Sequence, residues 1–230
     1  MTRDPSELPA CALRQAEQLF PPLLFAVAHS YGEADAPALH PAEAAALRHI
    51  PAERQAAFQR GRHCSRNALR QIGAGFRPVP PDADGAPQWP DGYTGSIAHS
   101  ASYSIAACAR RQDVAAVGVK VRAHAARFDC AGAEQLFSRD ETDWLAALPQ
   151  PQFDLHAHAL ACAKLACLKA MLAVRACAAP HQLVLRLDLV HGLFRAELPP
   201  HTAMPRRLLG RIACDGRHVY AGVWWPQAAR

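Results

Sequence analysis

The sequence predicts an α+β fold, with helices and antiparallel strand pairs in both halves of the chain. Two long segments, residues 51–72 and 155–179, have the composition of helices. Two later segments, residues 183–198 and 208–225, each place a His-Gly or Asp-Gly turn between two apolar runs, which is typical of β-hairpins. Because strands and helices do not alternate regularly, we do not expect the βαβ series of a parallel sheet.

Composition and charge limit the class of protein. The 230 residues are 50% hydrophobic and 20% charged, which is ample for a globular core of one large or two ordinary domains. The formal net charge of +5 favours an anionic small ligand or an acidic protein partner. The basic residues are scattered and aromatic residues make up only 7%, so we do not expect nucleic-acid binding.

The cysteines and the apolar runs indicate a cytoplasmic protein. None of the eight cysteines forms a CxxC pair or has the spacing of a zinc site, so we expect reduced and mostly buried thiols. The first residues lack the apolar core of a signal peptide, and no uninterrupted apolar run is long enough to span a bilayer. We expect no membrane association.

The first half is predicted to alternate helical and extended segments. Residues 7–19 form a short helix, 23–28 a strand, and the chain becomes helical again from about Pro41. The helix at 51–72 ends at Gly73, a typical C-cap. Residues 74–95 are rich in turn residues, and 103–109 form an apolar strand.

One face of the helix at 51–72 is strongly basic. Its apolar residues recur at spacings of three and four, so that face enters the core. The other face carries Arg54, Arg60, Arg62, Arg66 and Arg70. Taken alone, such a face is more often solvated than a ligand site.

Two cations lie together on the next strand. Residues 110–113 are predicted to turn the chain back as a hairpin into a β-branched run at 117–122. Because the side chains of a strand alternate between faces, Lys120 and Arg122 lie on the same face. The turn also marks a boundary between two halves.

The second half begins with a capped helix. Residues 130–148 are predicted to be helical, with Ser138 as N-cap and Glu141 three residues later, which together form a capping box. Pro149 and Pro151 separate this helix from the long helix at 155–179. The two hairpins complete the chain.

Four stretches in order resemble the enterobactin/surfactin-type 4'-phosphopantetheinyl transferases. They are Arg54-(x)6-Gly61-Arg62 with Ala68-Leu69, Trp89-Pro90-Asp91-Gly92-(x)2-Gly95-Ser96-Ile97-Ala98-His99-Ser100, Gly118-Val119-Lys120-Val121-Arg122, and Ala163-Lys164-Leu165-(x)3-Lys169-Ala170. The resemblance implies two pseudo-symmetric halves, residues 1–112 and 113–230, each with a small antiparallel sheet and a long helix. Such proteins hold coenzyme A in a cleft between the halves and transfer its phosphopantetheine arm to a serine of an apo carrier protein.

The resemblance also implies which residues contact coenzyme A. Arg54 and Arg62 would hold phosphates, because guanidinium groups match phosphate oxygens. Ser96 and His99 would lie near the 3'-phosphate and adenosine. Lys164 and Lys169 would lie near the pyrophosphate.

The sequence departs from this family where the family binds Mg²⁺. The family has two acids on the strand and a glutamate on the helix, and this chain has Lys120, Arg122 and Leu165 in their places. Mg²⁺ needs oxygen ligands, and two fixed cations would repel it, so we expect no metal. A family basic residue is also replaced by Gly85.

The helix glutamate is also the family's proton acceptor, and Leu165 cannot accept a proton. Glu141, His124 and Asp129 are possible substitutes. The simpler interpretation of each is a surface polar residue.

Two functional hypotheses follow. In the first, the chain binds coenzyme A and an acyl or peptidyl carrier protein but is an inactive or very weak transferase, a pseudoenzyme assisting a polyketide, peptide or fatty-acid-like pathway of secondary metabolism. In the second, it is an active, metal-independent transferase in which Lys120 and Arg122 replace Mg²⁺. The loss of both the metal ligands and the base favours the first. We expect a monomer.

Overall fold

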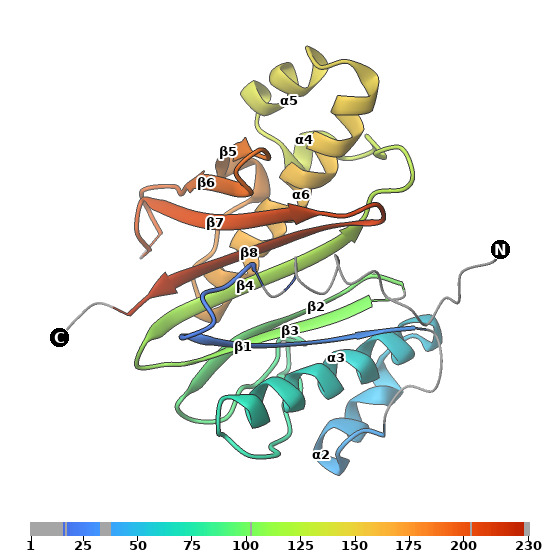
Figure 1. The fold of residues 1–230 in the computed structure, drawn as a ribbon, viewed down its shortest axis with the longest axis vertical. Helices are drawn as coiled ribbons and strands as arrows, with labels where there is room; N and C mark the ends of the chain where they lie inside the picture. The colour runs from blue at the N-terminus through green and yellow to red at the C-terminus, as the bar shows by residue number, and fades with distance from the viewer. Residues whose placement is uncertain (1–15, 17, 33–37, 102, 203, 228–230) are drawn as a thin grey trace.

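The fold contains two antiparallel sheets, each covered by one long helix (Figure 1). A computed structural model of the chain describes residues 16, 18–32, 38–101, 103–202 and 204–227. The first sheet comes from residues 25–110 and the second from residues 114–226. This architecture confirms the predicted α+β class. The predicted helix at 7–19 lies almost entirely outside the described residues.

The first sheet has three strands in the order β1 (Phe25–Tyr31), β3 (Tyr103–Arg110), β2 (Tyr93–His99). The helix α3 (Ala52–Gln71) packs against all three strands and ends near Gly73, as predicted. Gly61 allows the helix to approach β2 closely, because a Cβ atom there would come within 2.9 Å of the Ile97 side chain. The short helix α2 (Pro41–Ala44) and the 3-10 helix η1 (Ala45–His49) precede α3.

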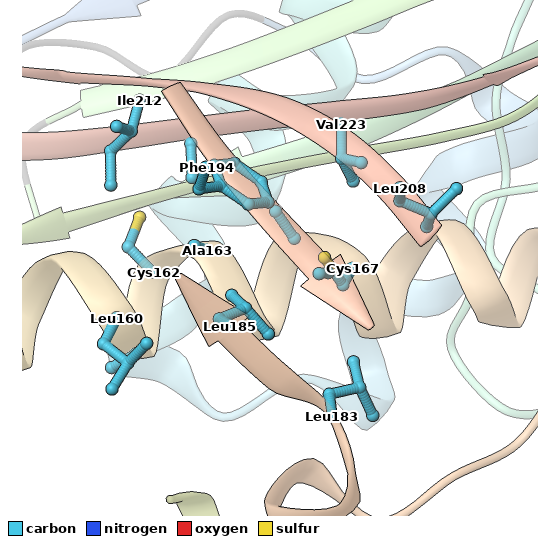
Figure 2. Packing of buried hydrophobic residues seen from close by; sticks show 14 of the residues in the cluster. Leu160, Cys162, Ala163, Cys167, Leu183, Leu185, Phe194, Leu208, Ile212 and Val223 are labelled. Carbon is cyan, nitrogen blue, oxygen red and sulfur yellow. The ribbon is translucent and has the colours of Figure 1, made fainter. Parts of the chain in front are cut away.

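The second sheet has five strands, β4 (Val114–Ala123), β8 (His218–Pro226), β7 (Arg207–Cys214), β6 (Leu193–Glu197) and β5 (Val184–Asp188), in that order. The helix α6 (Gln150–Ala173) lies across one face, and Figure 2 shows Leu160 and Cys167 of α6 below Phe194 and Val223 of the sheet. A Cβ atom on Gly118 would lie 1.9 Å from the Ala166 carbonyl oxygen, so α6 can sit this close to β4 only over glycine.

Valines on the opposite face of β4 join the two sheets. Val117, Val119 and Val121 are buried with Ile105 of β3 and Tyr220 of β8 in one apolar cluster. Alternation therefore divides β4: the valines face the first sheet, whereas Gly118 and Lys120 share the face that is covered by α6.

Three predicted elements have different bounds or partners. The predicted hairpin at 110–113 is wrong, because β3 and β4 belong to different sheets and the turn only links them. The helix predicted at 130–148 is divided into α4 (Ala133–Leu136) and α5 (Arg139–Ala146), because Phe137 is extended; Ser138 and Glu141 form the predicted capping box. The long helix begins earlier than predicted, because Pro151 is accommodated in its first turn, and it also ends earlier, at Ala173.

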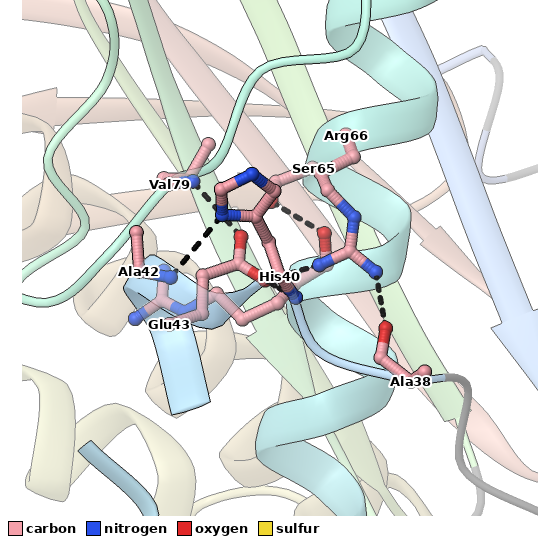
Figure 3. Close-up of polar contacts among 8 residues, drawn as sticks. Ala38, His40, Ala42, Glu43, Ser65, Arg66 and Val79 are labelled. Atoms are coloured by element: carbon pink, nitrogen blue, oxygen red, sulfur yellow. Dashed lines mark hydrogen bonds and ion pairs between the residues drawn. The ribbon is translucent and has the colours of Figure 1, made fainter. Parts of the chain in front are cut away.

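The basic face of α3 is solvated only at its ends, where Arg54 and Arg70 are exposed, which corrects the prediction for the arginines between them. Arg60, Arg62 and Arg66 are only 3%, 4% and 2% exposed. Arg66 forms an ion pair with the buried Glu43, which also accepts a hydrogen bond from the Val79 backbone N–H at 2.9 Å (Figure 3). This contact fixes α2 and the loop at residue 79 to α3, so Arg66 has a structural role.

Two further sequence predictions concern apolar segments and thiols. Within the described residues, α6 alone is long and apolar enough to cross a membrane by length and composition, and 67% of its most apolar window is buried inside the fold. Among the cysteines that the structure describes, Cys64, Cys108, Cys162 and Cys167 are buried and none is in a disulfide. Cys11 lies outside the described residues.

Candidate functional site

A pocket of about 300 Å³ lies between the first half of α3 and the turn that follows β2. We call it the α3–β2 pocket. Its polar lining consists of Glu53, Arg54, Arg60, His99 and Ser100. The structure therefore brings Arg54 and His99 together, two residues that were predicted to contact the same ligand. Their elements meet because Gly61 lets α3 rest on β2.

Arg60 and Arg62 bring buried positive charge to this part of α3. Arg60 donates a hydrogen bond to the Ala101 carbonyl at 2.7 Å, and its Nε has no partner among the described residues. The Arg62 guanidinium lies 4.6 Å from the centre of the Phe58 ring, and its Nε and Nη1 also have no partner in the described part of the chain. Burial lowers the pKa of Arg62 to about 10, so it remains charged at neutral pH. Unpaired buried donors are costly, and Arg62 has two of them and no ion pair, whereas the structural Arg66 leaves only its Nε unpaired.

Three further basic side chains come from β2, β4 and α6, and that of β2, His99, is neutral at neutral pH. Lys169 Nζ donates a hydrogen bond to the Ile97 carbonyl of β2. Burial and the nearby charges of Lys120 and Arg62 lower the pKa of Lys169 to about 7. Burial, together with Lys169 and Lys120, lowers the pKa of His99 to about 4. These shifts have one cause, which is that cations share a space from which water is partly excluded.

We call Arg54, Arg60, Arg62, His99, Lys120 and Lys169 the cation cluster. Burial, Arg122 and Arg54 lower the pKa of Lys120 as well, so its charge is also disfavoured. No member forms an ion pair with a described carboxylate. Glu53 lines the pocket without such a pair, and Glu43 is bound to Arg66. The cluster therefore has the electrostatic character of a site for a polyanion.

Arg122 has side-chain contacts that Lys120 does not share, although its charge lowers the pKa of Lys120. Its Nε donates a hydrogen bond to His158 Nδ1 at 3.0 Å, and its guanidinium lies 5.2 Å from the centre of the Phe128 ring. The two strand cations thus differ, because only Lys120 lowers the pKa of His99. We leave Arg122 out of the cation cluster.

Lys164 and Glu141 lie together in the core of the second half. Lys164 Nζ is 2.6 Å from Glu141 Oε2 and donates hydrogen bonds to the carbonyls of Pro180 and Leu183. Lys164 is 0% exposed and Glu141 is 4% exposed. Neither side chain lines the α3–β2 pocket, and each has its partners inside the protein.

The remaining candidate residues have local contacts. Ser96 Oγ accepts a hydrogen bond from the Val119 N–H at 3.1 Å and so ties β2 to β4. His124 Nε2 donates to the Asp215 carbonyl at 2.6 Å, while Asp129 is exposed and caps its own turn. Leu165 is partly exposed on α6. Gly85 has a φ of 82° in an exposed turn, a conformation that favours glycine.

Sequence reasoning missed two side-chain contacts, one at the pocket and one on β4. Ser100 Oγ lies 3.1 Å from Nε2 of the buried His218, which joins the pocket to β8. His158 positions Arg122. No sequence pattern links Ser100 to a residue 118 positions away. The sequence showed Arg60 on the basic face of α3, but it did not show that this side chain is buried, because its burial results from the packing of α3 on the first sheet.

The residues at the family's metal position do not fit Mg²⁺. Lys120, Arg122 and Leu165 offer no oxygen ligand, and Mg²⁺ is bound by carboxylates, phosphates and water. The described residues also contain no group of three His, Cys, Asp or Glu that could hold a metal ion. A phosphorylated ligand fits better, because the unpaired nitrogen atoms of Arg60 and Arg62 are donors suited to phosphate oxygens.

Comparison with known proteins identifies the family. Residues 42–109, which extend from α2 to β3 and include most of the cation cluster, match the model of the 4'-phosphopantetheinyl transferase N-terminal domain. The chain belongs to the 4'-phosphopantetheinyl transferase superfamily. It is 35% identical over 119 residues to 4'-phosphopantetheinyl transferase Svp of Streptomyces mobaraensis, and the match covers 51% of this chain and 48% of Svp.

Two other members of the superfamily match over shorter segments. 4'-phosphopantetheinyl transferase PptT of Mycobacterium tuberculosis is 39% identical over 84 residues, which is 36% of this chain and 37% of PptT. Npt of Nocardia iowensis is 34% identical over 86 residues, which is 37% of this chain and 39% of Npt. The matches thus span less than half the length of each of these transferases.

Proposed function

We propose that this chain binds coenzyme A through the cation cluster without Mg²⁺, binds an apo carrier protein, and acts as an accessory binding protein with little or no transferase activity. The observation that carries the proposal is the cation cluster around the α3–β2 pocket, in which Arg60 and Arg62 are buried and no member forms an ion pair with a described carboxylate. Coenzyme A is a polyanion, and Lys169 has no ion pair with a described carboxylate. Arg62 has no direct ion pair and only the nearby charge of Glu43, which is already paired with Arg66.

Residues from both halves of the chain would bind the phosphate groups of coenzyme A. Arg54, Arg60 and His99 line the pocket and would hold one phosphate group. Lys120 and Lys169 approach from β4 and α6 and would neutralise a second group directly. In the proposed complex these lysines replace the neutralising effect of a metal ion, and neutral His99 serves as a hydrogen-bond partner.

The loss of the glutamate that the resemblance assigns to proton transfer supports binding rather than transfer. Leu165 has no acid–base group, and Glu141 is held by Lys164 and by the backbone N–H groups of Ser138 and Leu185. His124 donates its ring N–H to a carbonyl of the chain. Arg122, which the alternative hypothesis needs beside Lys120, is bonded to His158. For these reasons we favour the accessory role.

The test combines calorimetry with intact-mass measurement. We expect coenzyme A to bind equally in Mg²⁺ and in EDTA, and the mass of an apo carrier protein to remain unchanged beside an active control transferase. A mass gain that survives EDTA would instead establish metal-free transfer. A gain lost in EDTA would show that the cation cluster accommodates a metal, and an absence of coenzyme A binding would end the proposal.

A further inference from the structure

The second sheet has a face that points away from α6 and is covered only in part by the described residues. Along β8, Leu19 and Phe20 lie against it, and a Cβ on Gly222 would come within 2.8 Å of Phe20. Along β5, β6 and β7, every second side chain points outward. We call these residues the outer face: Arg186, Asp188, Leu193, Arg195, Glu197, Arg207, Leu209 and Arg211.

The outer face exposes large apolar side chains at its centre. Leu209 is 67% exposed and Leu193 is 46% exposed, and they lie on the neighbouring strands β7 and β6. Val190, in the turn between β5 and β6, is 91% exposed. These are three of the eight large hydrophobic residues that are exposed in the described part of the chain. Such a concentration is typical of an interaction surface.

Four arginines surround the two leucines, and one of them, Arg211, donates a hydrogen bond to the Gln18 carbonyl at 2.8 Å. The strand register places Arg186 of β5 directly opposite Arg195 of β6, and like charges in this position destabilise a sheet. Neither forms an ion pair with a described acid, whereas Arg207 pairs with Glu197 at 3.6 Å. The outer face holds four arginines and two carboxylates, an excess of two positive charges. Its charge complements an acidic partner.

We propose that the outer face docks an acidic amphipathic helix of the carrier protein. The apolar stripe of that helix would lie on Leu193 and Leu209, and its flanking carboxylates would pair with Arg186 and Arg195. Three adjacent strands are about 10 Å across, which matches the diameter of roughly 10–12 Å of one helix. This inference rests on the proposed function, because it names the carrier as the partner.

The position of the outer face fits a holding role. Lys120 lies on the α6 side of β4, next to Gly118, while the outer face is on the opposite side of the same sheet. The sheet therefore separates a carrier docked here from Lys120 of β4 and Lys169 of α6, the two residues of the cation cluster that come from the second half. This is the arrangement expected of a protein that binds a carrier without acting on its serine.

Charge reversal on the outer face tests the proposal. The variant Arg186→Glu/Arg195→Glu is compared with Arg70→Glu/Arg77→Glu, which makes the same change in net charge at exposed positions in the first half. Binding of an apo acyl carrier protein, of anionic phosphatidylglycerol vesicles and of coenzyme A is measured for each. We expect the outer-face variant to weaken carrier binding by about 10-fold or more and the control by less than about 3-fold.

A second variant, Leu193→Ser/Leu209→Ser, keeps the charge and removes the exposed apolar surface; it should also weaken carrier binding. Equal loss in both charge variants would mean nonspecific attraction and would overturn the proposal. So would unchanged carrier binding in the outer-face variant, or vesicle binding in place of carrier binding. Coenzyme A binding tests the proposed function separately. If the outer-face variant keeps both coenzyme A binding and carrier binding, only the docking proposal is rejected. If the parent protein does not bind coenzyme A, the proposed function is rejected.

Discussion

Arg122 Nε donates a hydrogen bond to His158 Nδ1 at 3.0 Å, and this contact separates two cations that lie two residues apart on β4. His158 Nε2 lies 3.0 Å from the Ala126 carbonyl and therefore carries the ring proton, which leaves Nδ1 as the acceptor for Arg122. Burial lowers the pKa of His158 and favours this neutral form. Lys120 has no such partner among the described residues and faces His99 and Lys169.

The first prediction concerns these two cations. Lys120→Ala should weaken coenzyme A binding by about 10-fold or more, because a hydrogen bond to a charged group contributes roughly 1.5–3 kcal/mol. Arg122→Ala should change the affinity by less than about 3-fold, since its side chain is bonded elsewhere. Isothermal titration in EDTA measures both. Equal losses in the two variants would show that Arg122 leaves His158 when the ligand binds.

The second prediction concerns pH. Lys169 has a pKa of about 7, below its ordinary value, so it loses its proton as the pH rises from 7 to 9. An anionic ligand prefers the protonated lysine, so coenzyme A affinity should fall over this range, by up to about 10-fold per pH unit. The phosphates of the ligand are already ionised above pH 7 and do not contribute to the change. Lys169→Arg should flatten the profile, and a parent profile as flat as that of the variant would contradict the assignment.

The same shift affects stability with the opposite sign. Between pH 7 and the ordinary pKa of lysine, the unfolded chain binds more protons at Lys169 than the folded chain does. Stability in the absence of ligand should therefore rise with pH through this window, and the rise should be smaller in Lys169→Met. Denaturant unfolding at pH 7 and pH 9 measures the difference. The assignment would be contradicted if the free energy of unfolding fell from pH 7 to pH 9 in the parent protein but not in Lys169→Met.

The third prediction compares two buried arginines of α3. Arg62→Met should raise the free energy of unfolding without ligand by about 1 kcal/mol, because it removes unpaired buried donors while keeping the contact with Phe58. The same change should weaken coenzyme A binding. Arg66→Met is the matched control and should lower stability by about 3–5 kcal/mol, because Glu43 loses its partner. If both variants destabilise equally, Arg62 has a structural role instead.

The sequence predicted the bounds of the helices and strands better than it predicted which strands pair with one another. Residue spacing placed α3 and the two C-terminal hairpins close to their observed bounds, because apolar periodicity and Asp-Gly or His-Gly turns act locally. It did not show that β3 and β4 join different sheets, because sheet membership depends on contacts between distant residues.

In the candidate site, too, the sequence indicated which residues are charged but not which distant residues they contact. The family resemblance assigned Arg54, His99, Lys164 and Lys169 to one ligand; in the structure His99 lies near Arg54 and Lys169, whereas Lys164 lies elsewhere. On a helix, Lys164 and Lys169 are five residues apart, so they point in different directions. Only the packing of α5 and the 180–183 segment shows that Lys164 is enclosed. The charge of Arg122 was visible in the sequence, whereas its bond to His158 required the fold.

The last prediction concerns Lys164 and Glu141, which form a buried ion pair at 2.6 Å between α6 and α5. Lys164→Met should lower the free energy of unfolding by about 3–5 kcal/mol, because Glu141 keeps its buried charge but loses its counter-charge. Coenzyme A affinity, measured at low temperature where the variant remains folded, should stay within about 3-fold of the parent value. Lys169→Met provides the comparison, since Lys169 belongs to the cation cluster and its loss should weaken binding without a comparable loss of stability. Should Lys164→Met weaken coenzyme A binding as much as Lys169→Met does, Lys164 must reach the ligand and the enclosed pair must open when it binds.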